Sequence, residues 1–203
     1  MIRRLKPLVF VLCLAPLAWL AWRWSNNQLG FNRLETVARF TGDWTLRFLL
    51  ASLAISPLRR LVPALNDLIS YRRMLGLFAF AYGTLHFLHY LALDKLWEWN
   101  EIKTDFLLRR FFIAGLIAWA LMIPLAATSF NRAIRWMGAK RWQLLHRLAY
   151  VAAIAGVVHF YWQGKSFVID PVIYAIVLTA LLGYRAFVWA RKRVMRASAP
   201  RAS

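Results

Sequence analysis

Two long stretches of the sequence contain no Asp, Glu, Lys or Arg, and they most constrain how this chain can fold. They cover residues 74–93 and 111–130, and a helix needs about 20 mainly apolar residues to cross a bilayer. Of the 203 residues, 61% are apolar and 17% are charged, whereas soluble domains are roughly 45–50% apolar on a similar count. This composition excludes a disordered chain and disfavours a soluble globular protein, because too much apolar surface would remain exposed.

Four further apolar stretches bring the predicted number of membrane spans to six. They cover residues 6–24, 44–62, 142–162 and 171–190. Arg47 interrupts the second stretch, and Arg185 lies near the end of the last one, where its side chain can reach the interface. The first stretch follows a basic N-terminus, as in a signal peptide, but it continues to Trp24 without a clear cleavage site, so we interpret it as a retained helix. The sequence therefore predicts an all-α integral membrane protein with a six-helix transmembrane bundle.

The distribution of charge predicts how these spans are oriented. With the N-terminus in the cytoplasm, the cytoplasmic side holds 18 basic residues and one acid, Asp67, while the far side holds 9 basic and 7 acidic residues. The two sides then carry +17 and +2, which the positive-inside rule associates with an N-in, C-in topology. Because the basic residues cluster between apolar runs, we interpret the net charge of +19 as a topology signal and expect membrane lipid, not nucleic acid, as a partner.

All four histidines lie in the third and fifth predicted spans, and ionisable residues inside a membrane are candidate functional residues. His86 is 14 residues into its span and His159 is 16 residues into the other, which places them at similar depths of about 21 and 24 Å. Two histidines on facing helices can ligate one haem iron from both sides. We therefore predict a haem between His86 and His159, near the far side of the membrane.

His146 lies about 20 Å below His159 along the same span, too far to bind the same metal ion. The matching depth of the third span holds Arg72 and Arg73, which are not ordinary haem ligands, so we predict one haem per chain. Together with Arg141 and Arg147, these arginines would surround His146 with positive charge, which suits an anionic cofactor such as a flavin phosphate. The alternative is that the arginines only set the topology.

His89 follows His86 by three residues on the same helix face, and the sequence leaves its role open. It could replace His86 as the axial ligand, support it by a hydrogen bond, or form a paired or interfacial histidine near the membrane surface. A zinc or copper site is disfavoured, because no third ligand is evident.

Small residues flank both histidines of the predicted pair. They are Gly76, Ala79 and Gly83 near His86, and Ala152, Ala155 and Gly156 near His159. A porphyrin needs a helix face without bulk, but small residues also let membrane helices pack closely. The sequence favours neither interpretation over the other.

Other features narrow the possible chemistry. The single cysteine, Cys13, lies in an apolar run, so we expect a small apolar filler and neither a disulfide nor a cysteine metal cluster. No two glycines have G-x-G spacing, which excludes a dinucleotide-binding fingerprint and a P-loop, so electrons would have to come from elsewhere. We expect the acidic stretch 94–110 to be an interfacial loop, with a partner contact as the alternative.

Several short motifs mark the predicted spans. They are Phe40-Thr41-Gly42, Ser56-Pro57-Leu58-Arg59, Arg72-Arg73, Leu75-Gly76, Leu85-His86, Trp142, Leu145-His146, Tyr150 and His159-Phe160-Tyr161-Trp162. This pattern resembles the MsrQ (YedZ) family of haem-binding membrane subunits, which is part of the ferric-reductase-like transmembrane superfamily. The resemblance implies a haem-binding domain over residues 41–192. An N-terminal helix and loop (1–40) would precede it, and a cytoplasmic tail (193–203), expected to be disordered, would follow it.

The resemblance implies a function that the residues do not show by themselves. It implies a protein of the bacterial inner membrane that carries haem b and FMN. Such a protein passes electrons from a cytoplasmic flavin reductase or the quinone pool to a periplasmic molybdenum-cofactor enzyme, MsrP, which reduces methionine sulfoxide in oxidised proteins. The chain would then be an electron-transfer subunit and not a stand-alone enzyme. The family's functional histidines fall at His86, His146 and His159, and His89 departs from the family pattern.

Two other functions stay open from the sequence. One is a cytochrome b-type reductase that serves quinones or ferric iron. The other is a small non-redox transporter whose histidines bind substrate or protons. Such transporters often have internal repeats, and none is visible in this sequence.

Overall fold

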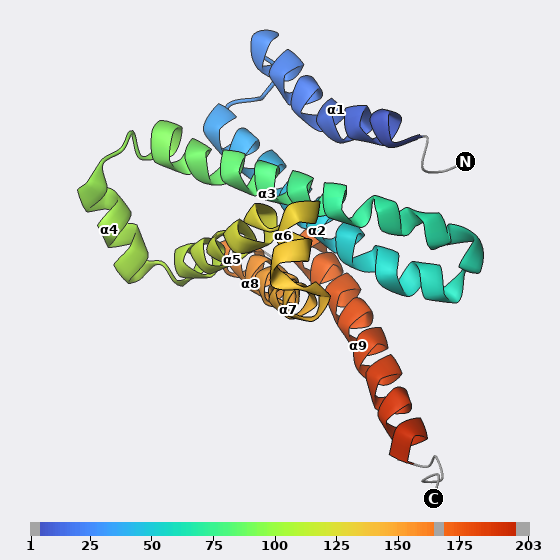
Figure 1. The fold of residues 1–203 in the computed structure, drawn as a ribbon. Helices are drawn as coiled ribbons and strands as arrows, with labels where there is room; N and C mark the ends of the chain where they lie inside the picture. The colour runs from blue at the N-terminus through green and yellow to red at the C-terminus, as the bar shows by residue number, and fades with distance from the viewer. Residues whose placement is uncertain (1–4, 165–168, 198–203) are drawn as a thin grey trace, which may run out of the picture.

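The computed structural model describes residues 5–164 and 169–197, and within these ranges the chain is helical and contains no β-strand (Figure 1). The α-helices are α1 (Lys6–Ser25), α2 (Arg33–Leu61), α3 (Arg72–His89), α4 (Trp99–Leu108), α5 (Arg110–Ala127), α6 (Asn131–Met137), α7 (Ala139–Leu145), α8 (Leu148–Gln163) and α9 (Ile169–Ala197). The 3-10 helix η2 (Pro63–Ser70) connects α2 to α3, and the π-helical turn η3 (Tyr90–Asp94) continues α3. The prediction of an all-α protein is confirmed.

Among the residues that the structure describes, five helical segments are long and apolar enough to cross a membrane by length and composition. They are Lys6–Ser25, Arg72–Asp94, Arg110–Ala127, Ala139–Gln163 and Asp170–Met195. These segments correspond to five of the six predicted spans, so the prediction of a multi-pass membrane protein is confirmed. The remaining predicted span, 44–62, lies within α2, which does not meet the same criterion. The number of six spans and the N-in, C-in orientation therefore stay predictions.

Helix α2 is the central helix of the bundle. It packs along α3 and also contacts η2, α8 and α9, and α2 and α3 lie side by side in Figure 1. It begins at Arg33, earlier than the predicted span, because Asn32 caps it: Oδ1 of Asn32 accepts a hydrogen bond from the backbone N–H of Glu35 at 3.1 Å. The chain leaves α2 after Leu61 and turns at Pro63, which cannot continue the helical hydrogen bonding.

The hydrophobic core lies where α1, α2, α3, α5, α8 and α9 meet. Leu53 on α2 and Tyr82 on α3 are almost completely buried there. The hydroxyl of Tyr82 donates a hydrogen bond to the backbone carbonyl of Cys13 at 2.9 Å, which joins α3 to α1. Cys13 itself is buried and free, which confirms its prediction as an apolar filler.

Helices α5 and α8 form the second closely packed pair of the bundle. The segment Ala139–Gln163, which contains the fifth predicted span, is not one straight helix, because the chain makes a turn at His146 and Arg147 between α7 and α8. Before it, α6 and α7 are separated by Gly138, whose φ of 77° lies in the region that favours glycine.

Two predicted irregular segments contain helix instead. The stretch 94–110, predicted as a loop, includes α4, which Figure 1 shows at the edge of the molecule between α3 and α5. The predicted tail 193–203 is helical as far as Ala197, because α9 continues beyond the apolar span. The expectation of disorder is wrong for this part, and residues 198–203 lie outside the described residues.

Candidate functional site

The structure brings His86 and His159 together. They come from α3 and α8, and their imidazole ring centroids lie 6.0 Å apart with an interplanar angle of 80°. Metal–imidazole nitrogen bonds are about 2 Å long, so two imidazoles on opposite sides of one ion have ring centroids roughly 6 Å apart. The observed spacing fits a single iron between the two rings.

A backbone carbonyl from a neighbouring helix orients each ring. Nδ1 of His86 lies 2.9 Å from the carbonyl oxygen of Ala38 on α2, and Nδ1 of His159 lies 2.7 Å from that of Phe111 on α5. A carbonyl can only accept, so each Nδ1 is assigned as the N–H donor and each Nε2 as the unprotonated nitrogen. This arrangement is typical of metal-ligating histidines, because it sets both the tautomer and the ring orientation.

Two glycines that the sequence analysis did not single out as site residues give the rings their space. A Cβ at Gly42 would lie 3.3 Å from Cε1 of His86, and a Cβ at Gly115 would lie only 2.6 Å from Nδ1 of His159. Gly42 is on α2, which packs against the helix that carries His86. Gly115 is on α5, which packs against the helix that carries His159. Gly42 belongs to the Phe40-Thr41-Gly42 motif, which is the signal that could have identified it.

The predicted small residues serve mainly the contacts between helices. A Cβ at Gly76 would meet Ser52, one at Gly83 would meet Met122 and Thr45, and one at Gly156 would meet Leu46. Gly83, Ala152 and Gly156 also line the cavity beside the histidine pair. Close helix packing and space for a ligand are therefore combined at these positions.

A cavity of about 510 Å³ contains the histidine pair, and α2, α3, α5 and α8 contribute to its wall. Pockets for small molecules and cofactors usually measure about 300–1,000 Å³. One part of the wall is aromatic, with Phe87 and Trp119 at 4.6 Å between ring centroids. Charged side chains also line the cavity: Glu35, Arg39, Asp43, Asp94, Asp105 and Arg109. An apolar cavity with a charged end fits a large prosthetic group that has its own polar substituents.

His89 also lines this cavity, but it does not replace His86 in the facing pair. Its side chain is buried, with 7% of the residue exposed, and neither ring nitrogen has a hydrogen-bond partner in the described part of the chain. Within the described residues, no group of three or more His, Cys, Asp or Glu side chains could hold a metal ion. His89 is therefore a buried imidazole on the cavity wall, outside the facing pair, with both ring nitrogens unbonded within the described residues.

His146 lies in a separate environment at the turn between α7 and α8. Its ring stacks on Trp142 with centroids 3.8 Å apart, and Nδ1 is 3.0 Å from the carbonyl oxygen of the same residue. Nε2 is buried and has no hydrogen-bond partner among the described residues. The positive charges of Arg72 and Arg73 both act on this ring.

Arg73 and Arg147 also make hydrogen bonds to residues other than His146. Arg73 donates a hydrogen bond to Oδ1 of Asn131 at 2.8 Å, which joins α3 to α6. Arg147 follows His146 in the turn, where its backbone N–H donates to the carbonyl oxygen of Leu144 at 3.1 Å. The arrangement offers an unpaired imidazole nitrogen beside cationic side chains, which can bind an anionic group.

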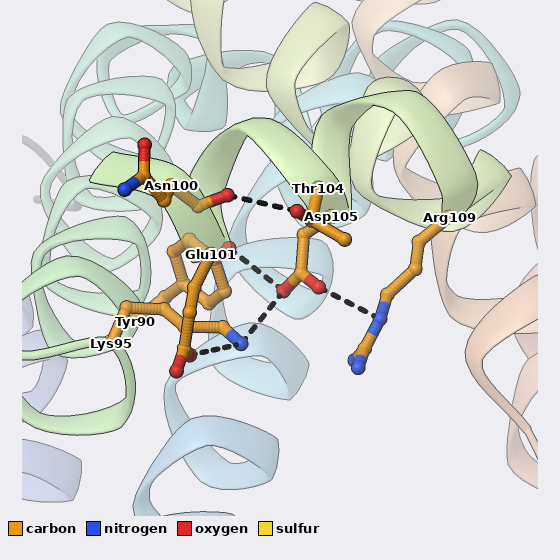
Figure 2. A network of polar contacts seen from close by, with 7 residues as sticks. All are labelled: Tyr90, Lys95, Asn100, Glu101, Thr104, Asp105 and Arg109. Carbon is orange, nitrogen blue, oxygen red and sulfur yellow. Dashed lines mark hydrogen bonds and ion pairs between the residues drawn. The ribbon is translucent and has the colours of Figure 1, made fainter. Parts of the chain in front are cut away.

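A buried carboxylate organises the charged end of the cavity (Figure 2). Asp105 on α4 is 4% exposed, and its oxygens accept from Tyr90 Oη at 2.9 Å, Lys95 Nζ at 3.1 Å and Arg109 Nε at 2.9 Å. Lys95 also donates to Glu101 at 3.1 Å. Burial acts to lower the pKa of Lys95, but the hydrogen bonds to Glu101 and Asp105 outweigh it and raise that pKa.

This network holds α4 against the ends of η3 and α5, and it changes the interpretation of the acidic stretch 94–110. Asp105 points inward and pairs with cations, so it is not available to contact a partner protein. The spacing of Asp105 and Arg109, four residues apart on a helical stretch, is the sequence signal that could have revealed the pair.

Comparison with known proteins shows that this chain is similar to a family of transmembrane components and to proteins named as haem-binding subunits. Residues 41–157 match the family described as "Ferric reductase like transmembrane component". Three similar proteins bear the name "Protein-methionine-sulfoxide reductase heme-binding subunit MsrQ". The one from Polaromonas naphthalenivorans is 47% identical over 93% of this chain and 87% of its own length. The one from Azospira oryzae is 48% identical over 89% and 78%, and that from Caulobacter vibrioides is 42% identical over 95% and 90%.

Proposed function

Because this chain belongs to the ferric-reductase-like transmembrane family and to its MsrQ haem-binding subunits, we propose that it is the membrane electron-transfer subunit of a protein-methionine-sulfoxide reductase system. The observation that carries the proposal is the facing pair His86 and His159, with ring centroids 6.0 Å apart and both Nδ1 atoms bonded to carbonyl oxygens. Haem b, one per chain, would be held by these two residues and would supply a one-electron carrier inside the membrane.

The chain's own side chains and backbone orient the two ligands and keep water away from them. The carbonyls of Ala38 and Phe111 hold both imidazoles as neutral ligands with Nε2 free to coordinate. Gly42 and Gly115 allow these carbonyl-bearing helices to approach the rings closely. Phe87 and Trp119 form an apolar wall, which excludes water and keeps the local dielectric low.

We place electron entry at the cytoplasmic side, beside His146. The unpaired Nε2 of His146, together with Arg72 and Arg73, supports binding of the phosphate of FMN, and Arg147 is a further candidate for this role. The donor of electrons is then a cytoplasmic flavin reductase or the quinone pool. No covalent bond of the protein is made or broken when an electron passes through the bundle.

We place electron exit at the other face of a bacterial inner membrane. The proposed acceptor is a periplasmic molybdenum-cofactor reductase of the MsrP type, which reduces methionine sulfoxide in oxidised proteins. The similar proteins are named as subunits of such a reductase, which supports a partner enzyme. The histidine cavity is lined by Asp105 and Arg109, which the topology prediction assigns to the far side, so the haem would lie near the face of the proposed acceptor.

The first test is the visible spectrum of the protein purified in detergent, oxidised and reduced with dithionite, with haem and released flavin quantified. We expect a low-spin spectrum with about one haem per chain, and FMN in the extract. His86→Ala and His159→Ala should each lose that spectrum, whereas His146→Ala should keep the haem and lose FMN. If both the His86 and His159 variants keep the wild-type haem spectrum and content, the proposed haem site is wrong.

The second test separates the proposed partner from other acceptors. Reduced protein is mixed with purified MsrP, with a ubiquinone analogue or with ferric citrate, and reoxidation of the haem is followed by absorbance. Fast reoxidation by MsrP alone supports the proposal, while a preference for the quinone or for ferric iron favours a cytochrome b-type reductase. A colourless protein made with ample haem supply, together with pH-dependent substrate uptake, would favour a transporter instead.

A further inference from the structure

His89 is a buried polar side chain without a partner. It lies on α3, three residues beyond His86, with 7% of the residue exposed. Neither Nδ1 nor Nε2 makes a hydrogen bond in the described part of the chain. Buried polar atoms in native proteins almost always have a partner, so this ring points to a group that the chain does not supply.

The surroundings of His89 identify where that group would lie. His89 lines the cavity that contains His86 and His159. The residue next to it, Tyr90, also lines the cavity and donates its hydroxyl to Asp105, the centre of the network in Figure 2. Asp94, a further lining residue at the end of η3, acts on the His89 ring through its charge, so His89 lies near the charged residues of the cavity.

None of the acidic side chains that line the cavity hydrogen-bonds to His89, and two of them pair with cations instead. Glu35 pairs with Arg39 at 2.8 Å, and Asp105 pairs with Arg109 at 2.9 Å. Arg109 uses only Nε in that pair, and Figure 2 shows its terminal nitrogens directed away from the carboxylate of Asp105. The cavity thus offers an imidazole and a guanidinium to a ligand that accepts hydrogen bonds and carries negative charge.

We propose that His89 binds a carboxylate of the haem, with Arg109 as the cationic partner at the same end of the cavity. The inference rests on the proposed function, because it takes the iron to be held by His86 and His159. With the iron so engaged, the two propionate carboxylates are the only groups of protohaem that can hydrogen-bond to an imidazole. His89 is then a cofactor-binding residue that contacts the edge of the porphyrin and is not an axial ligand.

The test compares protohaem with its dimethyl ester, in which both carboxylates are esterified and uncharged. The full-length chain is produced without haem, purified in detergent and reconstituted with each form, and haem transfer to a scavenger apoprotein gives the dissociation rate. In the wild type we expect protohaem to dissociate more slowly than the ester. His89→Phe should raise the protohaem rate about 10- to 100-fold, the range expected for a lost charge-assisted hydrogen bond, and leave the ester rate unchanged.

Two further variants separate binding from folding. His89→Asn keeps a hydrogen-bond donor, so it should restore part of the preference for protohaem. Phe87→Leu is the matched control, because Phe87 lines the same cavity but has no polar atom; it should raise both rates equally. All three variants should keep the low-spin spectrum, since both axial ligands are intact.

Each remaining outcome would overturn the inference. A His89→Phe variant that releases both haem forms faster by the same factor would make His89 a structural residue, and one that changes neither rate would remove it from the haem site. A switch to a high-spin spectrum would make His89 an axial ligand. Failure of the wild type to bind either form would instead contradict the proposed function itself.

Discussion

Gly115 leaves the space that the imidazole of His159 occupies: a Cβ at this glycine would lie 2.6 Å from Nδ1 of the histidine. The same nitrogen is bonded to the carbonyl oxygen of Phe111, one turn earlier on α5. One helix therefore both supplies the hydrogen bond that orients the ring and provides the gap into which the ring fits. His86 has the corresponding relationship to Ala38 and Gly42 on α2.

Gly115→Ala should weaken haem binding by about 10- to 100-fold. The new methyl group would displace the His159 ring and break its bond to Phe111, and removing such an outer partner of a metal ligand costs this much affinity. Gly42→Ala should have a smaller effect, because its Cβ would be 3.3 Å from His86. The ratio of haem to protein after purification and the Soret band measure both effects.

Gly183→Ala is the matched control for these two variants. Gly183 lies on α9, and no atom would lie within 4 Å of its Cβ. Alanine is also a better helix former than glycine by about 1 kcal/mol, so the control should keep the haem and be at least as stable as the wild type. Full haem content in the Gly115 variant would contradict the predicted role of this contact.

Loss of His146 should lower the FMN content of the protein and leave its haem content unchanged. His146→Ala, or replacement of Arg72 and Arg73 by alanine, should lower the FMN content several-fold, because charge-assisted bonds to the phosphate are lost. The haem spectrum should be unchanged, since His146 does not line the haem cavity described in the structure. Flavin fluorescence after denaturation measures the FMN. Arg191→Ala is the control, because Arg191 is an exposed arginine on α9, and this variant should retain flavin. Equal FMN content in all variants would contradict the proposed flavin site on the cytoplasmic side.

Asp105→Asn should destabilise the far end of the bundle by about 2–4 kcal/mol, because it leaves two cations without their buried carboxylate partner. For a chain of this size, such a loss lowers Tm by roughly 5–15 °C. Thermal unfolding followed by circular dichroism in detergent gives the shift. Glu101→Gln is the control: Glu101 also pairs with Lys95, but its side chain is 61% exposed, so the loss should stay below about 1 kcal/mol. Equal Tm values for the two variants would show that Asp105 has no special role.

The stability of the same network should depend on alkaline pH. The pKa of Lys95 in the folded chain lies above its ordinary value of 10.5, because Glu101 and Asp105 accept hydrogen bonds from the ammonium group and outweigh the opposing effect of burial. For a raised pKa, the stabilising contribution is complete below the unfolded value and is lost as the pH rises through the folded pKa.

We therefore expect the Tm of the wild type to fall between about pH 10 and pH 12 by more than that of Lys95→Gln, which lacks the titrating group. Other lysines and tyrosines titrate in both proteins, so the difference between the two curves reports Lys95 alone. Parallel curves would contradict the predicted contribution of this residue.

Much of the architecture follows from local sequence patterns. The apolar stretches 74–93 and 111–130 predict helices because a helix satisfies its own backbone hydrogen bonds in lipid. In the structure the first stretch is helical throughout and the second is helical as far as Ala127. The similar depths of His86 and His159 follow from counting residues along two helices, since the rise per residue is constant. The structure brings these two rings to 6.0 Å.

Other features depend on how helices rotate and approach one another, which composition along one helix does not determine. His86 and His89 have similar sequence surroundings, and only the packing of α3 against α2 and α5 directs His86 toward His159. Gly42 and Gly115, which leave space for the imidazole rings, lie on α2 and α5. The sequences of α3 and α8, which carry the histidines, therefore could not reveal them. The acidic stretch 94–110 predicts an interfacial loop, and only the folding of α4 against η3 and α5 buries Asp105 beside Lys95 and Arg109.

The sequence by itself determined that this chain is a helical membrane protein with histidines at matched depths, because hydrophobicity, charge and helical rise act along the chain. The tertiary structure decided which histidine faces which, where the cavity opens and which charges are paired. The reason is physical: these properties depend on contacts between side chains that are distant in sequence, and close packing selects one rotation of each helix.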